Sequence, residues 1–418
     1  GIGFPHRGAA ALLGPWVAAA AGDAEGAVVR PQLRGDGGVD YFGQIGQAHL
    51  FERARRFDEA ETDYKAVTSG DNPSELAVLA YGGFLERRGR RPPTWKREYG
   101  ATARARAATG KGAPPAPTLK QGAAFALLAP AATMISAKQD ATGLAYLRLA
   151  LSLDPERNDA WLMLGDLLQA RGDSEGARAA YNKPKSGAPE YPAAQAKLAW
   201  SHQSAGDKEG ALKLARNAAA TGDHDGRLTL SDLLRANEQY DEAIQILTAL
   251  INESKAPEWP LFYARGQAYE RSERWKEAEA DLVKALAMRP EEAEILNYLG
   301  YAWIDRGERL QEALGMVEKA AAANPRSGAI IDSLGWAHYR LGDYKKAVEI
   351  LEQAVEMEAG DPEINNHLGD AYWMVGRKDE AGFQWRRVLT LKPDDKIKAD
   401  AETKIAKGLG PSPKIAGQ

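Results

Sequence analysis

Residues 330–355 read IIDSLGWAHYRLGDYKKAVEILEQAV, and this stretch is the middle one of three similar copies between Ala293 and Pro393. Each copy has a Leu-Gly pair, then a turn that contains glycine, then an alanine that begins a second apolar stretch. The copies recur about every 34 residues, and a period of that length indicates stacked structural repeats instead of one globular core. The three sets are Leu334-Gly335, Leu341-Gly342 and Ala347; Leu299-Gly300, Arg306-Gly307 and Ala313; and Leu368-Gly369, Val375-Gly376 and Ala381.

The glycine of each Leu-Gly pair needs a physical reason, because glycine inside a helix costs about 1 kcal/mol relative to alanine. Leu334 and Gly335 share one face of a predicted first helix. We expect a second helix to cross that face so closely that a side chain would hold the axes apart. Gly342 is predicted to end the first helix, and Asp343 to cap the second. The predicted facing stripe of the second helix is Ala347, Leu351 and Ala354.

The spacing, the Leu-Gly pairs, the alanines and a proline near the end of most units resemble the tetratricopeptide repeat. That resemblance implies an all-α, right-handed superhelical solenoid of helix-turn-helix units with a groove on its concave side. Counted along the chain, about eleven units are expected. The first unit, residues 8–34, is expected to be degenerate, with its second helix after Gly22-Asp23.

Composition predicts where the array is divided. Residues 1–107 form a degenerate N-terminal array, and residues 108–122 are rich in proline and glycine and predict an extended connector. Residues 123–393 form the main array, 394–407 a capping helix, and 408–418 a disordered tail. Fewest contacts should cross the connector, so a fragment that lacks residues 1–117 is expected to stay folded.

Charge and composition exclude several functions. The formal net charge is -4, which argues against general nucleic-acid binding, and there is no cysteine for thiol chemistry, a zinc site or a disulfide. No run approaches the roughly 20 apolar residues of a membrane helix. The sequence has no Gly-rich phosphate loop and no catalytic motif, and Asp223-His224-Asp225 fits a solvated turn better than a metal site. We therefore expect no enzyme activity, no cofactor and no metal.

A stripe of aromatic, Asn and Asp residues recurs on the first helices of the last three units, away from the Leu-Gly face. Each unit contributes one column with the spacing i, i+4 and i+7. The columns are Asn297, Tyr301 and Ile304; Asp332, Trp336 and Tyr339; and Asn366, Asp370 and Trp373. Aromatic side chains beside amides and carboxylates match the anchors of peptide-recognition sites. The alternative is that a neighbouring unit or the capping helix covers them. The predicted partner-binding residues are Asn297, Tyr298, Tyr301, Asp332, Trp336, Tyr339, Asn366, Asp370 and Trp373. The stripe lacks the lysine pattern with which chaperone-binding members of the superfamily hold a terminal carboxylate.

Residues 260–393 also resemble the C-terminal repeats of bacterial envelope proteins of this superfamily, one of which is a lipoprotein adaptor for a carboxy-terminal processing protease. The resemblance implies a scaffold or adaptor that holds a protein or peptide partner, in the periplasm or at the outer membrane. A cytoplasmic location is the alternative. Two other functions stay open: a structural subunit of an envelope assembly or secretion complex, bound through its convex face, and the regulatory part of an enzyme.

Overall fold

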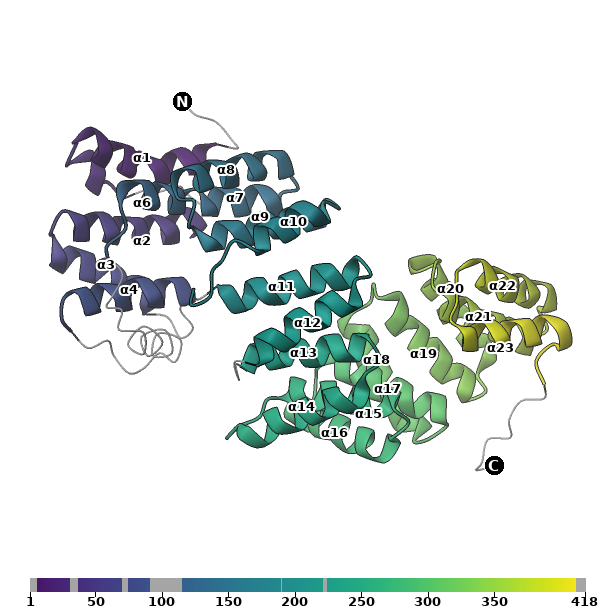
Figure 1. Ribbon diagram of the computed structural model, residues 1–418. Helices are drawn as coiled ribbons and strands as arrows, with labels where there is room; N and C mark the ends of the chain where they lie inside the picture. The colour runs from purple at the N-terminus through teal and green to yellow at the C-terminus, as the bar shows by residue number, and fades with distance from the viewer. Residues whose placement is uncertain are drawn as a thin grey trace. The chain divides into compact units, whose positions relative to one another are not determined.

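The computed structural model describes residues 6–30, 37–69, 74–90, 115–188, 190–220 and 224–410, and every regular element in these ranges is a helix (Figure 1). The contacts within the chain divide it into two units, Gly1–Leu233 and Leu234–Gln418. Within each unit, consecutive helices pack in pairs that succeed one another along the chain. The predicted fold class, an all-α array of helix-turn-helix units, is confirmed.

The first unit contains α1 (Arg7–Ala21), the short 3-10 helix η1 (Gly26–Val28), α2 (Gly37–Arg53), α3 (Phe57–Thr68), α4 (Glu75–Arg87), α6 (Leu119–Ala126), α7 (Leu128–Ser136), α8 (Asp140–Leu153), α9 (Asn158–Ala170), α10 (Ser174–Tyr181), α11 (Tyr191–Ser204) and α12 (Lys208–Ala219). The boundary between the units falls inside α13 (His224–Ala236). The second unit continues with α14 (Tyr240–Glu253), α15 (Trp259–Arg271), α16 (Trp275–Met288), α17 (Ala293–Arg306), α18 (Leu310–Ala323), α19 (Gly328–Arg340), α20 (Tyr344–Met357), α21 (Pro362–Met374), α22 (Lys378–Thr390) and α23 (Asp395–Lys407).

The glycine of the Leu-Gly pair lies where two paired helices touch. A Cβ atom added to Gly335 in α19 would lie 2.6 Å from Cγ of Leu351 in α20. In the following pair, a Cβ atom on Gly369 would lie 2.5 Å from the indole nitrogen of Trp385. Ala347, Leu351 and Ala354 are completely buried. The predicted close approach is confirmed, and it explains why these helices retain a residue of low helix propensity.

The turns between paired helices are built as predicted. Gly342 has φ +85°, a left-handed conformation that glycine adopts without strain, and it follows the end of α19. Asp343 then accepts a hydrogen bond of 3.3 Å from the backbone N–H of Lys346 and caps α20. These two residues stop one helix and start the next within a few positions.

The first repeat, predicted over residues 8–34, is more degenerate than expected. The helix α1 runs through Pro15 and ends at Gly22, whose φ is +81°. Asp23 accepts a hydrogen bond from the backbone of Gly26, as a helix cap would, but only the three-residue η1 follows before Val29. The expected second helix in residues 8–34 is therefore replaced, in the described residues, by one 3-10 turn.

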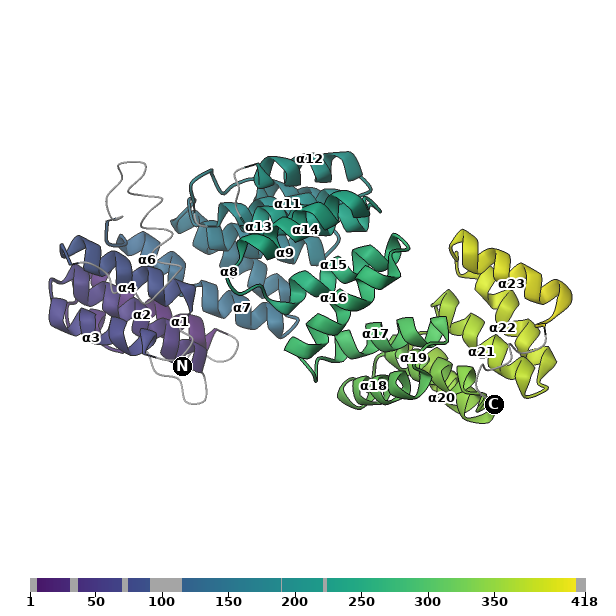
Figure 2. The ribbon, with the colours of Figure 1, turned by 90° about the horizontal axis from the view of Figure 1, so that it is seen from below.

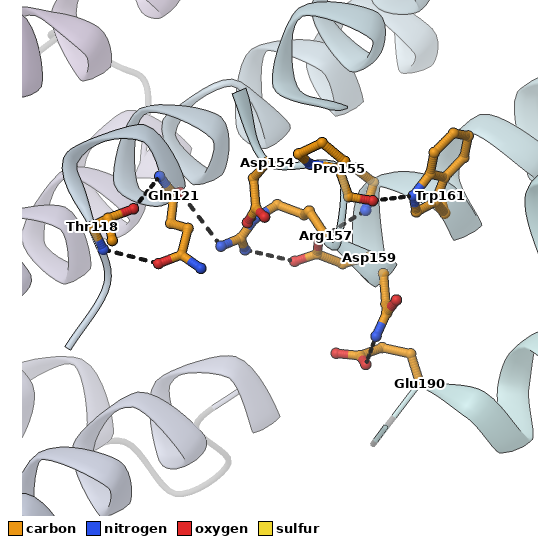
Figure 3. Close-up of polar contacts among 10 residues, drawn as sticks. Thr118, Gln121, Asp154, Pro155, Arg157, Asp159, Trp161 and Glu190 are labelled. Atoms are coloured by element: carbon orange, nitrogen blue, oxygen red, sulfur yellow. Dashed lines mark hydrogen bonds and ion pairs between the residues drawn. The ribbon is translucent and has the colours of Figure 1, made fainter. Parts of the chain in front are cut away.

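The end of the predicted connector is helical (Figure 3). Thr118 and Gln121 form a capping box at the start of α6, in which each side chain bonds the backbone of the other residue. Arg157, just before α9, donates to the backbone oxygen of Gln121 at 3.4 Å and pairs with Asp154 and Asp159. Residues 119–122 therefore begin a helix that is tied to the repeats after it, and residues 108–114 lie outside the described residues.

The helix α6 also packs against the start of the chain. Gly122 lies so close to the ring of Trp16 in α1 that no side chain would fit between them. Ile45 of α2 shares one apolar cluster with Phe125 of α6 and Leu147 of α8. The predicted division between residues 1–107 and 123–393 is therefore wrong, because helices on both sides of the proposed connector bury one core together.

The predicted capping helix is present. Predicted over residues 394–407, it is α23 (Asp395–Lys407), and Asp394 caps it by accepting from the backbone N–H of Ile397 at 2.8 Å. Residues 411–418 of the predicted disordered tail lie outside the described residues. No described helix is long and apolar enough to cross a membrane.

Candidate functional site

The nine predicted partner-binding residues lie on α17, α19 and α21, which are the first helices of three successive pairs in the second unit (Figure 2). The helices α17 and α19 contact each other, as do α19 and α21, so side chains from different repeats meet. We give the name candidate face to eight side chains on these three helices. They are Asn297, Tyr301 and Asp305 from α17, Asp332, Trp336 and Tyr339 from α19, and Glu363 and His367 from α21.

Trp336 is at the centre of the candidate face and is more deeply buried than an open stripe implies. Its ring stacks on Tyr339, with centroids 4.4 Å apart, and on His367, with centroids 4.0 Å apart and planes 12° from parallel. Only 8% of the residue is exposed. The expectation that Trp336 lies open to a partner is wrong, because a histidine from the next repeat covers it.

Asp332 and His367 form a buried ion pair beside that stack. The Nδ1–H of His367 donates to both carboxylate oxygens of Asp332, at 2.9 and 3.0 Å. Burial by itself lowers the pKa of His367, but the Asp332 carboxylate and the charges of Glu363 and Asp370 outweigh it, so the pKa is raised above its ordinary value. The imidazole is therefore held toward its charged form against the indole ring.

Tyr301 crosses from α17 to α21, two repeats further along the chain. Its hydroxyl donates to Glu363 Oε1 at 2.6 Å. Burial, followed by the negative charges of Glu363, Asp332 and Asp305, raises the pKa of the Tyr301 hydroxyl. The ring remains half-buried, like that of Tyr339. These two tyrosines, with the exposed Asp305 and Glu363, are the accessible part of the candidate face.

The third predicted column, Asn366, Asp370 and Trp373, is covered by α23. Lys404 of α23 donates to Asp370 at 2.8 Å and to Asn366 at 3.2 Å, and Trp385 donates to the other oxygen of Asp370 at 2.9 Å. Gly408, just after α23, lies against the Trp373 ring. For this column the expectation of an open surface is wrong, and the alternative that the capping helix covers it is confirmed.

Tyr298 and Asn297 behave differently although they are adjacent. The Tyr298 hydroxyl donates to Glu270 of α15 at 3.2 Å, and its ring lies edge-on to Tyr263, so this residue joins two repeats away from the candidate face. The Asn297 side-chain oxygen is buried without a hydrogen-bond partner, and so is the Trp336 indole nitrogen. A buried polar atom without a partner costs about 1–3 kcal/mol, so each of these two atoms calls for a partner that the described residues do not supply.

The sequence interpretation missed His367, Glu363 and Lys404. A signal was present for one of them: Lys404 and Asp370 have opposite charges and stand one repeat apart, at equivalent positions of successive first helices. Lys404 follows Asp370 by 34 residues, whereas His367 follows Asp332 by 35, one more than the repeat spacing. The contact between Tyr301 and Glu363 spans two repeats. These two contacts depend on how the repeats pack, which a period alone does not define.

Large apolar side chains of the second unit are exposed on second helices instead. Phe383 of α22 has 58% of its surface exposed, and the others are Val283 and Met288 of α16 and Met357 of α20. Within the described residues of this unit, no large apolar side chain is comparably exposed on a first helix. The two surfaces therefore differ: the candidate face is aromatic and charged, whereas the second helices expose single large apolar side chains among charged ones.

The repeat architecture defines the chain as a helical-repeat protein. Residues 141–192, 263–328 and 333–396 match the tetratricopeptide repeat family. The repeats in these three ranges match that family, whose members generally mediate protein–protein interactions. No curated protein matches the sequence significantly.

Solved structures support the fold. The crystal structure of the APC/C hetero-tetramer Cut9-Hcn1 contains a chain that is 15% identical, with a TM-score of 0.51 over 96% of this chain and 84% of that one. A tetratricopeptide repeat protein from Parabacteroides merdae is 14% identical, with a TM-score of 0.48 over 60% of this chain and 98% of that one. At 15% identity, the likeness to the chain of the Cut9-Hcn1 structure shows the fold alone.

Proposed function

We propose that the second unit is a non-catalytic scaffold or adaptor whose candidate face holds an extended peptide segment of a partner protein. The observation that carries this proposal is the pair of buried polar atoms without partners, the Trp336 indole N–H and the Asn297 side-chain oxygen. One is a donor and the other an acceptor, and the backbone of an extended peptide offers both complementary groups at every residue. Half-buried Tyr301 and Tyr339 add aromatic surface that binding would desolvate.

Asn297→Ala and Tyr339→Ala test this proposal. A peptide is first selected from a display library on the intact chain, and its affinity is then measured by calorimetry. Asn297→Ala should weaken binding about tenfold, because the peptide N–H loses its acceptor. It should not lower the free energy of unfolding, because that oxygen has no partner to lose in the free protein. Tyr339→Ala should weaken binding by about 2 kcal/mol.

Phe383→Ala is the matched control, since it removes an exposed aromatic ring from a second helix of the same unit. It should leave the affinity unchanged. Equal affinity of Asn297→Ala, Tyr339→Ala and the parent for every selected peptide would contradict the proposal.

A structural subunit bound through its second helices is the alternative. The exposed apolar side chains Phe383, Met357 and Met288 favour it, because such residues are costly in water and typical of interfaces. In that case Phe383→Ala would weaken partner binding and Asn297→Ala would not.

We also propose an envelope location, with a processing protease or an envelope assembly complex as the partner. Support comes from the resemblance of residues 260–393 to envelope adaptors. Fractionation of the source cells checks the location: recovery of the native protein in the cytoplasmic fraction alone would contradict it.

A further inference from the structure

Carboxylates outnumber cations around the candidate face. Asp305 and Glu363 are exposed, and neither forms an ion pair with any described residue. Asp332 is neutralised by His367, and Asp370 by Lys404. Arg340 of α19 donates to the backbone oxygen of Asp305 at 2.6 Å, so its guanidinium lies beside the face, but it forms no ion pair with the Asp305 carboxylate. The face therefore presents net negative charge to solvent.

Aromatic rings lie among these charges. Tyr301 bridges to Glu363, and Tyr339 covers Trp336 on the side opposite His367. A lysine or arginine side chain is attracted both to carboxylates and to aromatic faces, and its stem packs on the rings. An acidic side chain at the same place would meet like charges on partly desolvated groups, which is unfavourable.

An acidic cluster alone does not define a site, and here Trp336 supplies an independent observation. The residue lies inside the cluster with more than nine-tenths of its surface buried, and its indole N–H has no acceptor. A neutral peptide carbonyl fits that donor beside so many carboxylates, because it accepts a hydrogen bond without adding negative charge.

We propose that the segment held on the candidate face carries a lysine or arginine side chain, which lies between the carboxylates of Asp305 and Glu363 against Tyr301 and Tyr339. The inference rests on the proposed function and names the chemistry of its partner, a cationic peptide. It is opposite in polarity to recognition of a terminal carboxylate.

A display library of random 12-residue peptides is the probe. It is selected in parallel on the intact chain, on the double variant Asp305→Asn/Glu363→Gln, and on a control, Glu318→Gln/Glu356→Gln. The control removes the same two charges from exposed positions on the second helices α18 and α20. Peptides from the parent should contain Lys and Arg about threefold above their frequency in the library. Their affinity for Asp305→Asn/Glu363→Gln should fall about threefold to tenfold, the range for partly exposed charge pairs.

Three results overturn the inference. The selected peptides have no excess of Lys and Arg, or the double variant selects the same peptides with the same affinity, or the control loses as much affinity as the double variant. If those peptides still depend on Tyr339 and Asn297, the inference fails and the proposed function stands. If no selected peptide depends on either residue, both fail.

Discussion

Gly335 and Gly315 both lie inside helices of the second unit, but only Gly335 faces another helix at close range. A Cβ atom on Gly335 would press on Leu351, whereas one on Gly315 in α18 would meet nothing within 4 Å. Gly335→Ala should therefore destabilise the second unit by about 1–3 kcal/mol, and Gly315→Ala should stabilise it by up to about 1 kcal/mol. Denaturant unfolding of both variants measures the difference. Equal effects would show that the helix crossing does not require glycine.

At the same scale, sequence alone predicted the glycine contact but not the burial of Trp336. A Leu-Gly pair is a local signature, because only glycine permits the approach of two backbones. The exposure of Trp336 depends on His367, which lies 31 residues further along, three positions short of the 34-residue spacing between Gly335 and Gly369. The sequence of one repeat therefore predicts which helix face a residue occupies. The packing of the next repeat decides whether that face is exposed.

At the scale of helices, α19 and α21 are joined by the Asp332–His367 pair. The pKa of His367 is raised in the folded state, so its stabilising contribution is fully present below the unfolded value of about 6.5 and is lost as pH rises through the higher folded pKa. The groups that act on it are Asp332 of α19 and Glu363 and Asp370 of α21.

The measurement is the free energy of unfolding between about pH 6 and 9 for the parent and for His367→Gln, whose amide does not titrate. The parent should lose stability relative to His367→Gln as pH rises above about 6.5. Parallel curves over this range would mean that the imidazole is not held in its charged form.

The capping helix α23 could be predicted from the sequence, but its contacts could not. The existence of α23 followed from the sequence, because a solenoid end needs a polar outer face. That Lys404 reaches Asp370 and Asn366 depends on how α23 packs on α21 and α22. The third column of the predicted stripe therefore does not form an open surface. Its contacts with α23 stabilise the C-terminal repeats.

For the whole molecule, the two units imply a different fragment from the one that composition suggests. A fragment 224–418, which begins with α13, should stay helical and melt cooperatively, because the apolar clusters of the last repeats lie within it. A fragment 118–418 should lose part of its structure, because Phe125 and Leu147 lose Ile45 and the other apolar neighbours that α1 and α2 provide. Thermal unfolding followed by circular dichroism, together with the binding of a dye to exposed apolar surface, compares the two fragments. A fragment 118–418 as cooperative as the intact chain would contradict the shared core.

Composition misplaced this boundary for a physical reason. Proline and glycine in residues 108–117 disfavour a continuous helix on sequence grounds, but they carry no information about which helices pack together on either side of them. Trp16 and Gly122 are a hundred residues apart, and their contact leaves no periodic signature. Period, fold class and turn chemistry are local properties that repeat, whereas a domain boundary depends on unique long-range contacts.

The central claim, that a partner segment lies along the first helices α17, α19 and α21, is tested most directly by photo-crosslinking. A selected peptide with a photoreactive residue is irradiated on the intact chain, and the modified positions are identified by mass spectrometry. The account predicts adducts on the candidate face, at Tyr301, Tyr339 or their neighbours, and none on the second helices. Adducts concentrated on α16, α20 and α22 around Met288, Met357 and Phe383 would contradict it and would favour the structural subunit.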